Sequence, residues 1–151
     1  MLRVDKITYA ALEAALLEYV RGRAADELPV MRMIALPREA IRQRAERLAQ
    51  AVSSHAATDV DIEVVPGGSL LGAGSAPEET LPTALLALRS ARLSARVMEQ
   101  RLRGGPTPII ARIEGKRVLL DLRTVPEESD CVVERALLGL LADEGTPPAT
   151  R

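Results

Sequence analysis

The sequence predicts a small domain of the α+β class, in which an antiparallel sheet packs against helices on one face. Several segments repeat apolar residues at helical spacing, and others alternate apolar and polar residues as strands do. The order along the chain is helix, helix, strands, helix, hairpin, helix. Since single strands and helices do not alternate regularly, this order favours an antiparallel sheet over a parallel one.

The composition indicates a globular chain with an aliphatic core. The 151 residues are 47% hydrophobic, which is enough for one domain with a buried interior. The only aromatic residues are two tyrosines, so the chain lacks the stacking platform of single-stranded nucleic-acid binders. A net charge of −1 argues against a free-standing nucleic-acid binder, although a local arginine patch remains open.

Cysteine, histidine and hydropathy limit the location and the chemistry. The single cysteine, Cys131, excludes an internal disulfide and fits a reducing compartment. Together with one histidine, His55, it cannot supply a tetrahedral metal site. We expect His55 at the surface and Cys131 to pack, although a reactive thiol at the start of a helix is an alternative. No signal-peptide or membrane-spanning run exists, so we expect a soluble cytoplasmic protein without membrane contact.

The first predicted element is a helix over residues 7–21. Thr8 is placed to cap its start, and Gly22 stands where a helix commonly ends. Its apolar residues cover almost the whole circumference, and such a helix is stable when both sides are buried. The pattern therefore predicts a partner surface for this helix.

A linker, an extended segment and a second helix follow. Residues 23–28 are polar and indicate a linker, whereas the short apolar run 29–36 indicates a strand or extended segment. Pro37 is suited to the first turn of a helix that continues to about residue 52. In that helix Ile41 begins one apolar face at helical spacing, and arginines and glutamates cover the rest.

A strand and a glycine-rich stretch come next. After a loop over 53–59, the alternating β-branched run 60–65 predicts a strand. The stretch 67–75 contains four glycines and suggests a phosphate-binding loop, but it lacks the G-x-x-x-x-G-K-[ST] pattern and no helix clearly starts at its end. We therefore prefer a bent strand at an interface.

The last third predicts a strand at 83–88 and a helix at 95–103 that is capped by Ser94. A hairpin then joins the apolar runs 109–113 and 118–122 through Glu114-Gly115-Lys116-Arg117. A final helix follows, which Ser129 or Asp130 caps and which has its inward face at Val133, Leu137, Leu140 and Leu141.

Two groups of charged residues are candidates for a site. Arg3, Asp5 and Lys6 stand directly before the first helix, where an arginine and a helix start both favour an anion. An ordinary charged chain end is the alternative. Arg112 lies in the middle of an apolar strand, so it faces either solvent or a site. With Asp121 and Arg123 on the next strand, a surface ion-pair ladder is the alternative.

Five segments, taken in order, carry a resemblance to a known family. They are Leu2–Thr8 with Ala11–Glu13, Pro29–Met33, Gly72–Pro77 with Leu81-Pro82, Pro108–Ile113, and Leu120–Val125. Together they resemble the C-terminal domain of the bacterial selenocysteine synthases (L-seryl-tRNA selenium transferases), over roughly residues 2 to 137. In the segment Gly72–Pro77, Ala73 departs from the family's middle glycine.

The resemblance implies a fold, a reaction and a division into parts. It implies the small C-terminal domain of an aspartate-aminotransferase-like pyridoxal phosphate (PLP) enzyme, which converts seryl-tRNA(Sec) to selenocysteinyl-tRNA(Sec) with selenophosphate in a ring-shaped homo-oligomer. Residues 1–22 would be the interdomain helix that leaves an absent PLP domain, residues 23–144 the small domain, and residues 145–151 a disordered tail.

The resemblance also assigns the site residues. The lysine that binds the cofactor lies in a Ser-Gly-Asp-Lys motif that this chain lacks, and neither Lys6 nor Lys116 matches it. We therefore expect no catalytic residue and no bound PLP in this chain, which alone would be inactive. Arg3 falls in the family's Arg-x-x-Arg-Val-Asp-Lys run and would hold the phosphate or selenium donor. The residues that would line the active site are Asp5, Lys6 and Arg112.

Two alternatives remain open. One is a free-standing interaction or RNA-contacting module, for which the arginine-bearing helix from Arg38 to Arg47 is the best support. The other is the same domain of a related PLP enzyme that acts on a free amino acid. The sequence does not distinguish this alternative from a selenocysteine synthase.

Overall fold

The computed structural model describes residues 3–55, 60–71 and 80–142. Its contacts divide the chain into two compact units, Met1–Leu36 and Pro37–Arg151. Within the described residues, no helix is both long enough and apolar enough to cross a membrane.

The first unit contains helix α1 (Lys6–Val20), followed by two short helices. The expected cap, Thr8, is wrong: Asp5 caps α1, because its carboxylate accepts the Thr8 backbone N–H at 2.8 Å. Gly22 has a φ of 70°, the left-handed backbone that ends helices, as expected.

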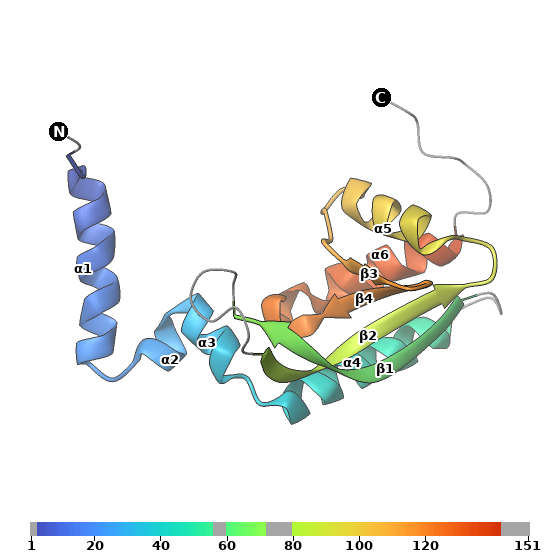
Figure 1. The fold of residues 1–151 in the computed structure, drawn as a ribbon, viewed down its shortest axis with the longest axis horizontal. Coiled ribbons are helices and arrows are strands. Elements are labelled where there is room, and N and C mark those ends of the chain that lie inside the picture. The colour runs from blue at the N-terminus through green and yellow to red at the C-terminus, as the bar shows by residue number, and fades with distance from the viewer. Residues whose placement is uncertain (1–2, 56–59, 72–79, 143–151) are drawn as a thin grey trace. The chain divides into compact units, whose positions relative to one another are not determined.

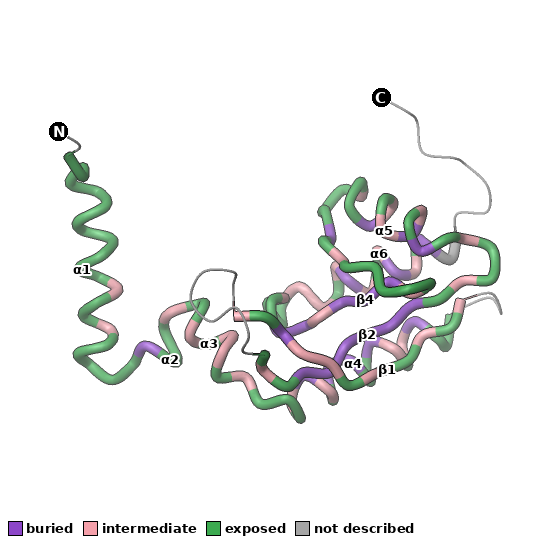
Figure 2. The backbone as a smooth tube through the Cα atoms, viewed as in Figure 1, coloured by how far each residue is buried: buried purple, intermediate pink, exposed green. Residues whose placement is uncertain are grey.

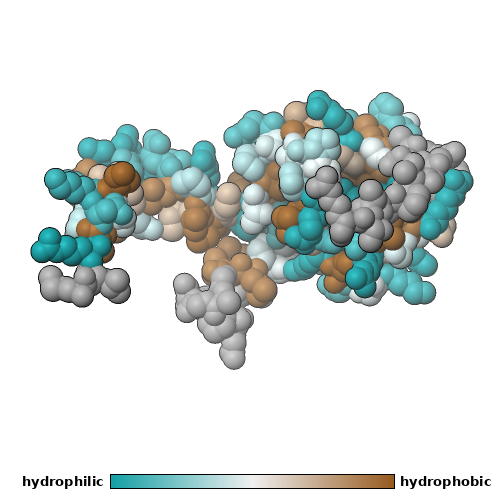
Figure 3. Space-filling model, turned by 90° about the horizontal axis from the view of Figure 1, so that it is seen from above, coloured by the Kyte–Doolittle hydropathy of each residue, from teal (hydrophilic) through white to brown (hydrophobic). Residues whose placement is uncertain are grey.

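Helix α1 has no buried residue, although its side chains are apolar on all sides. Figure 2 shows this helix almost entirely as exposed, and Figure 3 shows apolar atoms on the surface of the first unit. Ile7 and Val20, at the two ends, are 82% and 84% exposed. The all-round apolar character predicted from the sequence is therefore present, and the described residues of the first unit do not bury this helix.

Two further predictions in the first unit are wrong. The polar linker contains a helical turn, α2 (Ala24–Glu27), and the expected strand is helix α3 (Pro29–Ala35). The proline explains the second error, because it occupies the first position of α3, where its missing N–H costs nothing. A short apolar run does not distinguish a strand from a helix by periodicity alone.

The second unit is an antiparallel sheet with three helices, which confirms the predicted α+β class (Figure 1). The strands stand in the order β1-β2-β4-β3. They are β1 (Val60–Leu70), β2 (Thr80–Ser90), β3 (Arg112–Glu114) and β4 (Arg117–Asp121). The helices are α4 (Arg38–Ser53), α5 (Ala95–Gly104) and α6 (Asp130–Ala142), with short 3₁₀ turns at Leu122–Thr124 and Glu127–Ser129.

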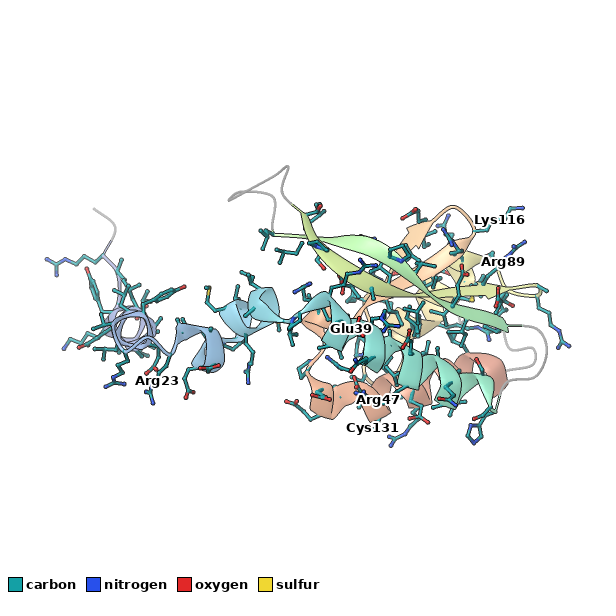
Figure 4. All side chains as sticks on the ribbon, turned by 90° about the horizontal axis from the view of Figure 1, so that it is seen from below. Arg23, Glu39, Arg47, Arg89, Lys116 and Cys131 are labelled. Carbon is teal, nitrogen blue, oxygen red and sulfur yellow. The ribbon has the colours of Figure 1, made fainter. Side chains whose placement is uncertain are left out.

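The core lies between the sheet and the helices. In Figure 4, α4 and α6 lie on the same side of the sheet, as the sequence predicts. Strand β2 is buried on both faces over Thr83–Leu88, and Figure 2 shows the buried residues concentrated in β2, β4 and the helices that face them. Leu86, Val118 and Leu137 are completely inaccessible to solvent. On the opposite face of the sheet, Leu85, Ala87 and Leu119 form a small cluster of their own.

The register explains how proline and glycine fit into long strands. Pro66 and the two glycines after it belong to β1, which is an edge strand and therefore tolerates a residue without an N–H donor. The predicted strands at 60–65 and 83–88 are thus both confirmed and both longer than expected. Gly72 and Gly74, like the tail after residue 142, lie outside the described residues.

The predicted hairpin is confirmed, with Gly115 at a φ of 59° in its turn. Its first strand is shorter than expected and begins only at Arg112, because Ile109 donates its N–H to the Leu102 carbonyl of α5 instead of to a strand. Ser94 caps α5, as predicted, and accepts the Val97 N–H at 3.3 Å. His55 is exposed as expected, whereas Cys131, which was expected to pack, is also exposed.

Candidate functional site

Three of the predicted site residues lie at the start of α1. Arg3 is exposed and precedes the helix, Asp5 is its cap and Lys6 is its first residue. Hydrogen bonds from the Thr8 backbone N–H and hydroxyl lower the pKa of the Asp5 carboxyl. Asp5 thus keeps a negative charge next to Lys6 and orders the first turn. The structure brings these three residues together in the first unit.

The fourth predicted residue, Arg112, lies in the second unit at the glycine-bearing end of the sheet. It opens β3, and its guanidinium donates to the Gly68 carbonyl of β1 at 3.4 Å. The side chain remains exposed, and this hydrogen bond uses one of its five N–H groups. Arg112 therefore presents a cation at the open face of the sheet.

The alternative for Arg112, a surface ion-pair ladder with Asp121 and Arg123, is wrong because Arg123 is buried, at 5% exposed. The Asp121 carboxylate instead accepts the hydroxyls of Ser69 at 2.5 Å and Thr83 at 3.0 Å. These hydrogen bonds satisfy polar groups that the sheet would otherwise bury without partners.

Arg123 completes this network from the other side. Its Nε donates to the Ser69 hydroxyl at 3.1 Å, and a terminal nitrogen donates to the Pro82 carbonyl at 2.8 Å. The network ties β1, β2 and the end of β4 to one another.

The sequence did not reveal Ser69 and Thr83 as members of this network. Strand alternation puts each of them on a definite face, but the register that aligns them with Asp121 depends on which strands pair. The only available signal was the pair of small hydroxyl residues beside the glycines and a proline.

The arginines of α4, which supported an RNA-contacting module, are largely engaged with carboxylates. Arg42 pairs with Glu39 and Glu46 on the same helix. Arg44 is buried and pairs with Asp130 of α6. This helix therefore presents much less free positive charge than its sequence suggests.

Both lysines lie at the surface of the described residues. Lys6 starts α1 and Lys116 lies in the β3–β4 turn.

The family model of L-seryl-tRNA selenium transferase (SelA) matches residues 1–126. Curated proteins named L-seryl-tRNA(Sec) selenium transferase are also similar to this chain. The protein of Geotalea daltonii is 38% identical over 140 residues, which are 92% of this chain and 30% of that protein. The protein of Desulfotalea psychrophila is 36% identical, covering 83% and 27%, and that of Aquifex aeolicus is 37% identical, covering 93% and 30%.

The chain thus spans about 30% of the length of these relatives and matches a C-terminal part of them. The family match covers both units, from the candidate residues before α1 through the Asp121 network. The chain belongs to the L-seryl-tRNA selenium transferase family.

Proposed function

We propose that this chain is the C-terminal part of a PLP-dependent enzyme that converts seryl-tRNA(Sec) to selenocysteinyl-tRNA(Sec) with selenophosphate. The family match over residues 1–126 carries this proposal. The names of the relatives contain both the aminoacyl-tRNA and the transferred element, which supports an aminoacyl-tRNA over a free amino acid as the substrate.

The fold of the second unit is proposed to be the small domain of an aspartate-aminotransferase-like enzyme. An antiparallel sheet with helices on one side is compatible with that role. Residues 1–22 are proposed to be the interdomain helix that leaves the PLP domain, with the small domain at 23–144. The exposed apolar side chains of α1 support this part, because a helix of this kind is stable when other surfaces cover it.

PLP would supply the electron sink for the chemistry when bound, and its lysine is proposed to lie upstream of this chain. Arg3 is proposed to bind the phosphate of the selenium donor, because a guanidinium matches phosphate oxygens with two parallel hydrogen bonds. Asp5 and Lys6 would line the site beside it. Arg112 of the second unit is also proposed to line the active site; its guanidinium is exposed and donates to the Gly68 carbonyl.

A cytoplasmic homo-oligomer without membrane contact completes the proposal. The 151-residue chain alone is expected to be inactive and to retain no PLP after dialysis. An absorbance band of protein-bound PLP that persists in the dialysed chain would contradict this expectation.

A chimera tests the function directly. The matching C-terminal segment of the Aquifex aeolicus relative is replaced by this chain, and a truncated protein without that segment is the control. We expect the chimera to transfer selenium from selenophosphate to seryl-tRNA(Sec), whereas the truncation is inactive. Free serine is offered in a parallel reaction. A folded, PLP-loaded chimera without transfer to tRNA, or one that prefers free serine, would refute the proposal.

A further inference from the structure

A basic hollow of about 930 Å³ lies at the hairpin end of the sheet, far along β2 from the Asp121 network. The end of β2, the β2–α5 connection, the first turn of α5 and the β3–β4 turn line it. Among the described residues, the charged side chains that line it are Arg89, Arg92, Arg96, Lys116 and one carboxylate, Asp61. We propose that the basic hollow binds backbone phosphates of a folded RNA, an inference that rests on the proposed function because a tRNA is the substrate there.

The cations are carried by a well-defined turn. The Ser90 hydroxyl accepts the backbone N–H groups of Arg92 at 3.1 Å and Leu93 at 3.0 Å, and Ser94 then caps α5. These hydrogen bonds order the backbone between Arg89 and Arg96, so the side chains of these two arginines extend from an ordered backbone. Figure 4 shows Arg89 and Lys116 at the same end of the sheet, and both line the basic hollow.

Three of the four cations have no competing partner in the part of the chain that the structure describes. Arg89, Arg96 and Lys116 are exposed and form no ion pair or hydrogen bond there. In contrast, Arg103 pairs with Glu99 and Arg117 pairs with Glu63. Free guanidinium and ammonium groups bind phosphate at a smaller cost, because no existing pair has to break.

The acidic residues near the basic hollow leave an excess of positive charge. Asp61 stands opposite Arg89 in the strand register but forms no ion pair with it among the described residues. On the adjoining open face of the sheet, Glu63 is neutralised by Arg117, and Glu114 stays exposed. Among the described residues that line the basic hollow, Arg89, Arg96 and Lys116 stand against the single carboxylate of Asp61, in contrast to a whole chain of net charge −1.

The chemistry of the lining favours RNA backbone over a small molecule or unstacked bases. Both tyrosines, Tyr9 and Tyr19, are in α1, so the basic hollow offers no aromatic platform for bases. Phosphate contacts from arginine and lysine hold an RNA in position and read its shape. The volume is large for a single phosphate, and cations from three separate elements suit successive phosphates along a strand.

A charge-neutralised variant tests the inference. Arg89→Gln, Arg96→Gln and Lys116→Gln are combined in the 151-residue chain, and binding to a folded tRNA(Sec) transcript is measured by fluorescence anisotropy across a salt series. We expect binding by the parent to weaken with salt. In the variant we expect about tenfold weaker binding at low salt, and a slope of log K against log salt that is shallower by about 2.

The matched control removes the same charge elsewhere: Arg32→Gln, Arg38→Gln and Arg135→Gln, three exposed arginines of α3, α4 and α6. Its affinity should stay within about twofold of the parent. Equal losses in both variants would show a general charge effect and overturn the site. Circular dichroism and the urea midpoint verify that both variants are folded. If the combined variant unfolds, the single substitutions Arg89→Gln and Lys116→Gln are tested in its place.

Two further outcomes overturn the proposal. No measurable binding of tRNA(Sec) by the parent would do so, as would tighter binding of a polyglutamate peptide, which indicates an acidic protein partner. The same substitutions in the chimera separate this inference from the proposed function. If the chimera is active but the substitutions do not change its affinity for tRNA, only the proposed role of the basic hollow is refuted. If the chimera is inactive but the substitutions weaken tRNA binding by the 151-residue chain, only the proposed function is refuted.

Discussion

Arg44 of α4 donates to both carboxylate oxygens of Asp130, the first residue of α6, although the two residues are 86 positions apart in the sequence. The Nε–Oδ2 distance is 3.0 Å, and other nitrogens of Arg44 donate to the carbonyls of Leu122 and Val125. One buried guanidinium therefore ties α4 to the segment between β4 and α6.

Removing one partner of this pair is expected to be costly. Asp130→Asn leaves the Arg44 charge buried, at 7% side-chain exposure, without its counter-charge, which should lower the free energy of unfolding by about 3 kcal/mol. Urea denaturation followed by circular dichroism measures the change. The control is Glu127→Gln, which removes the exposed partner of Arg47 and should cost less than about 1 kcal/mol. Equal costs would mean that burial of Arg44 does not matter.

Asp121→Asn tests the hydrogen-bond network that Asp121 forms with Ser69 and Thr83. The asparagine loses the charge that accepts Ser69 and Thr83, so we expect a loss of about 2 kcal/mol in unfolding free energy. Glu63→Gln, which breaks an exposed cross-strand pair with Arg117, is the matched control and should cost under about 1 kcal/mol. A neutral Asp121→Asn would show that the network does not hold the strands.

Gly67→Ala tests the close approach of β1 and β2. A Cβ at Gly67 would lie 2.3 Å from Cδ1 and 2.8 Å from Cγ of Leu85, a buried side chain. Overpacking of this kind should cost about 1–3 kcal/mol, measured from the shift of the urea midpoint. Gly104→Ala, where the added Cβ meets no atom within 4 Å, should be neutral or stabilising. Adding Leu85→Ala to Gly67→Ala relieves the steric clash but should not restore the stability of the parent, because Leu85 also packs against Ala87 and Leu119.

Glu39 gives a pH prediction. Hydrogen bonds from Arg42 and Gln43 lower the pKa of its carboxyl from 4.5 to about 2. A lowered folded-state pKa stabilises the fold above the unfolded value, and this contribution disappears as the pH falls through the folded value. The stability difference between the parent and Glu39→Gln should therefore be constant above about pH 5 and vanish towards pH 2. Carboxyl NMR titration reads the pKa, and in Arg42→Gln it should rise towards 4.5.

Arg3→Ala in the active chimera tests the proposed donor site. Loss of a charge-assisted hydrogen bond to phosphate should raise the selenophosphate concentration needed for half-maximal rate by about tenfold. The control is Arg21→Ala at the other end of α1, where Arg21 pairs with Glu18, and it should leave that concentration unchanged. Unchanged kinetics in Arg3→Ala would remove Arg3 from the site.

Local signals in the sequence were sufficient for much of the fold and insufficient for the site. The cap at Ser94, the hairpin turn at Gly115 and the apolar face of α4 depend on residues a few positions apart, and all three were predicted correctly. Helix α3 was predicted as a strand, because seven residues that start with proline carry too little periodicity.

The site residues depended on long-range pairing. The alternative of a surface ladder put Arg123 in solvent, yet Arg123 is buried and donates to Ser69, 54 positions earlier. Arg44 looked like one of several surface arginines, because its partner Asp130 comes from another helix. Whether such a charged residue is buried or exposed depends on its partner, and a single sequence does not identify a partner that is distant along the chain.

Helix α1 also bears on the steady-state amount of this chain in a cell. Chaperones and proteases bind exposed apolar segments, and α1 offers such residues along its whole length. A copy of the chain with α1 uncovered is a substrate for this quality control, whereas a covered copy is not. The steady-state amount of the chain would then follow the supply of whatever covers α1 more closely than the rate at which the chain itself is synthesised.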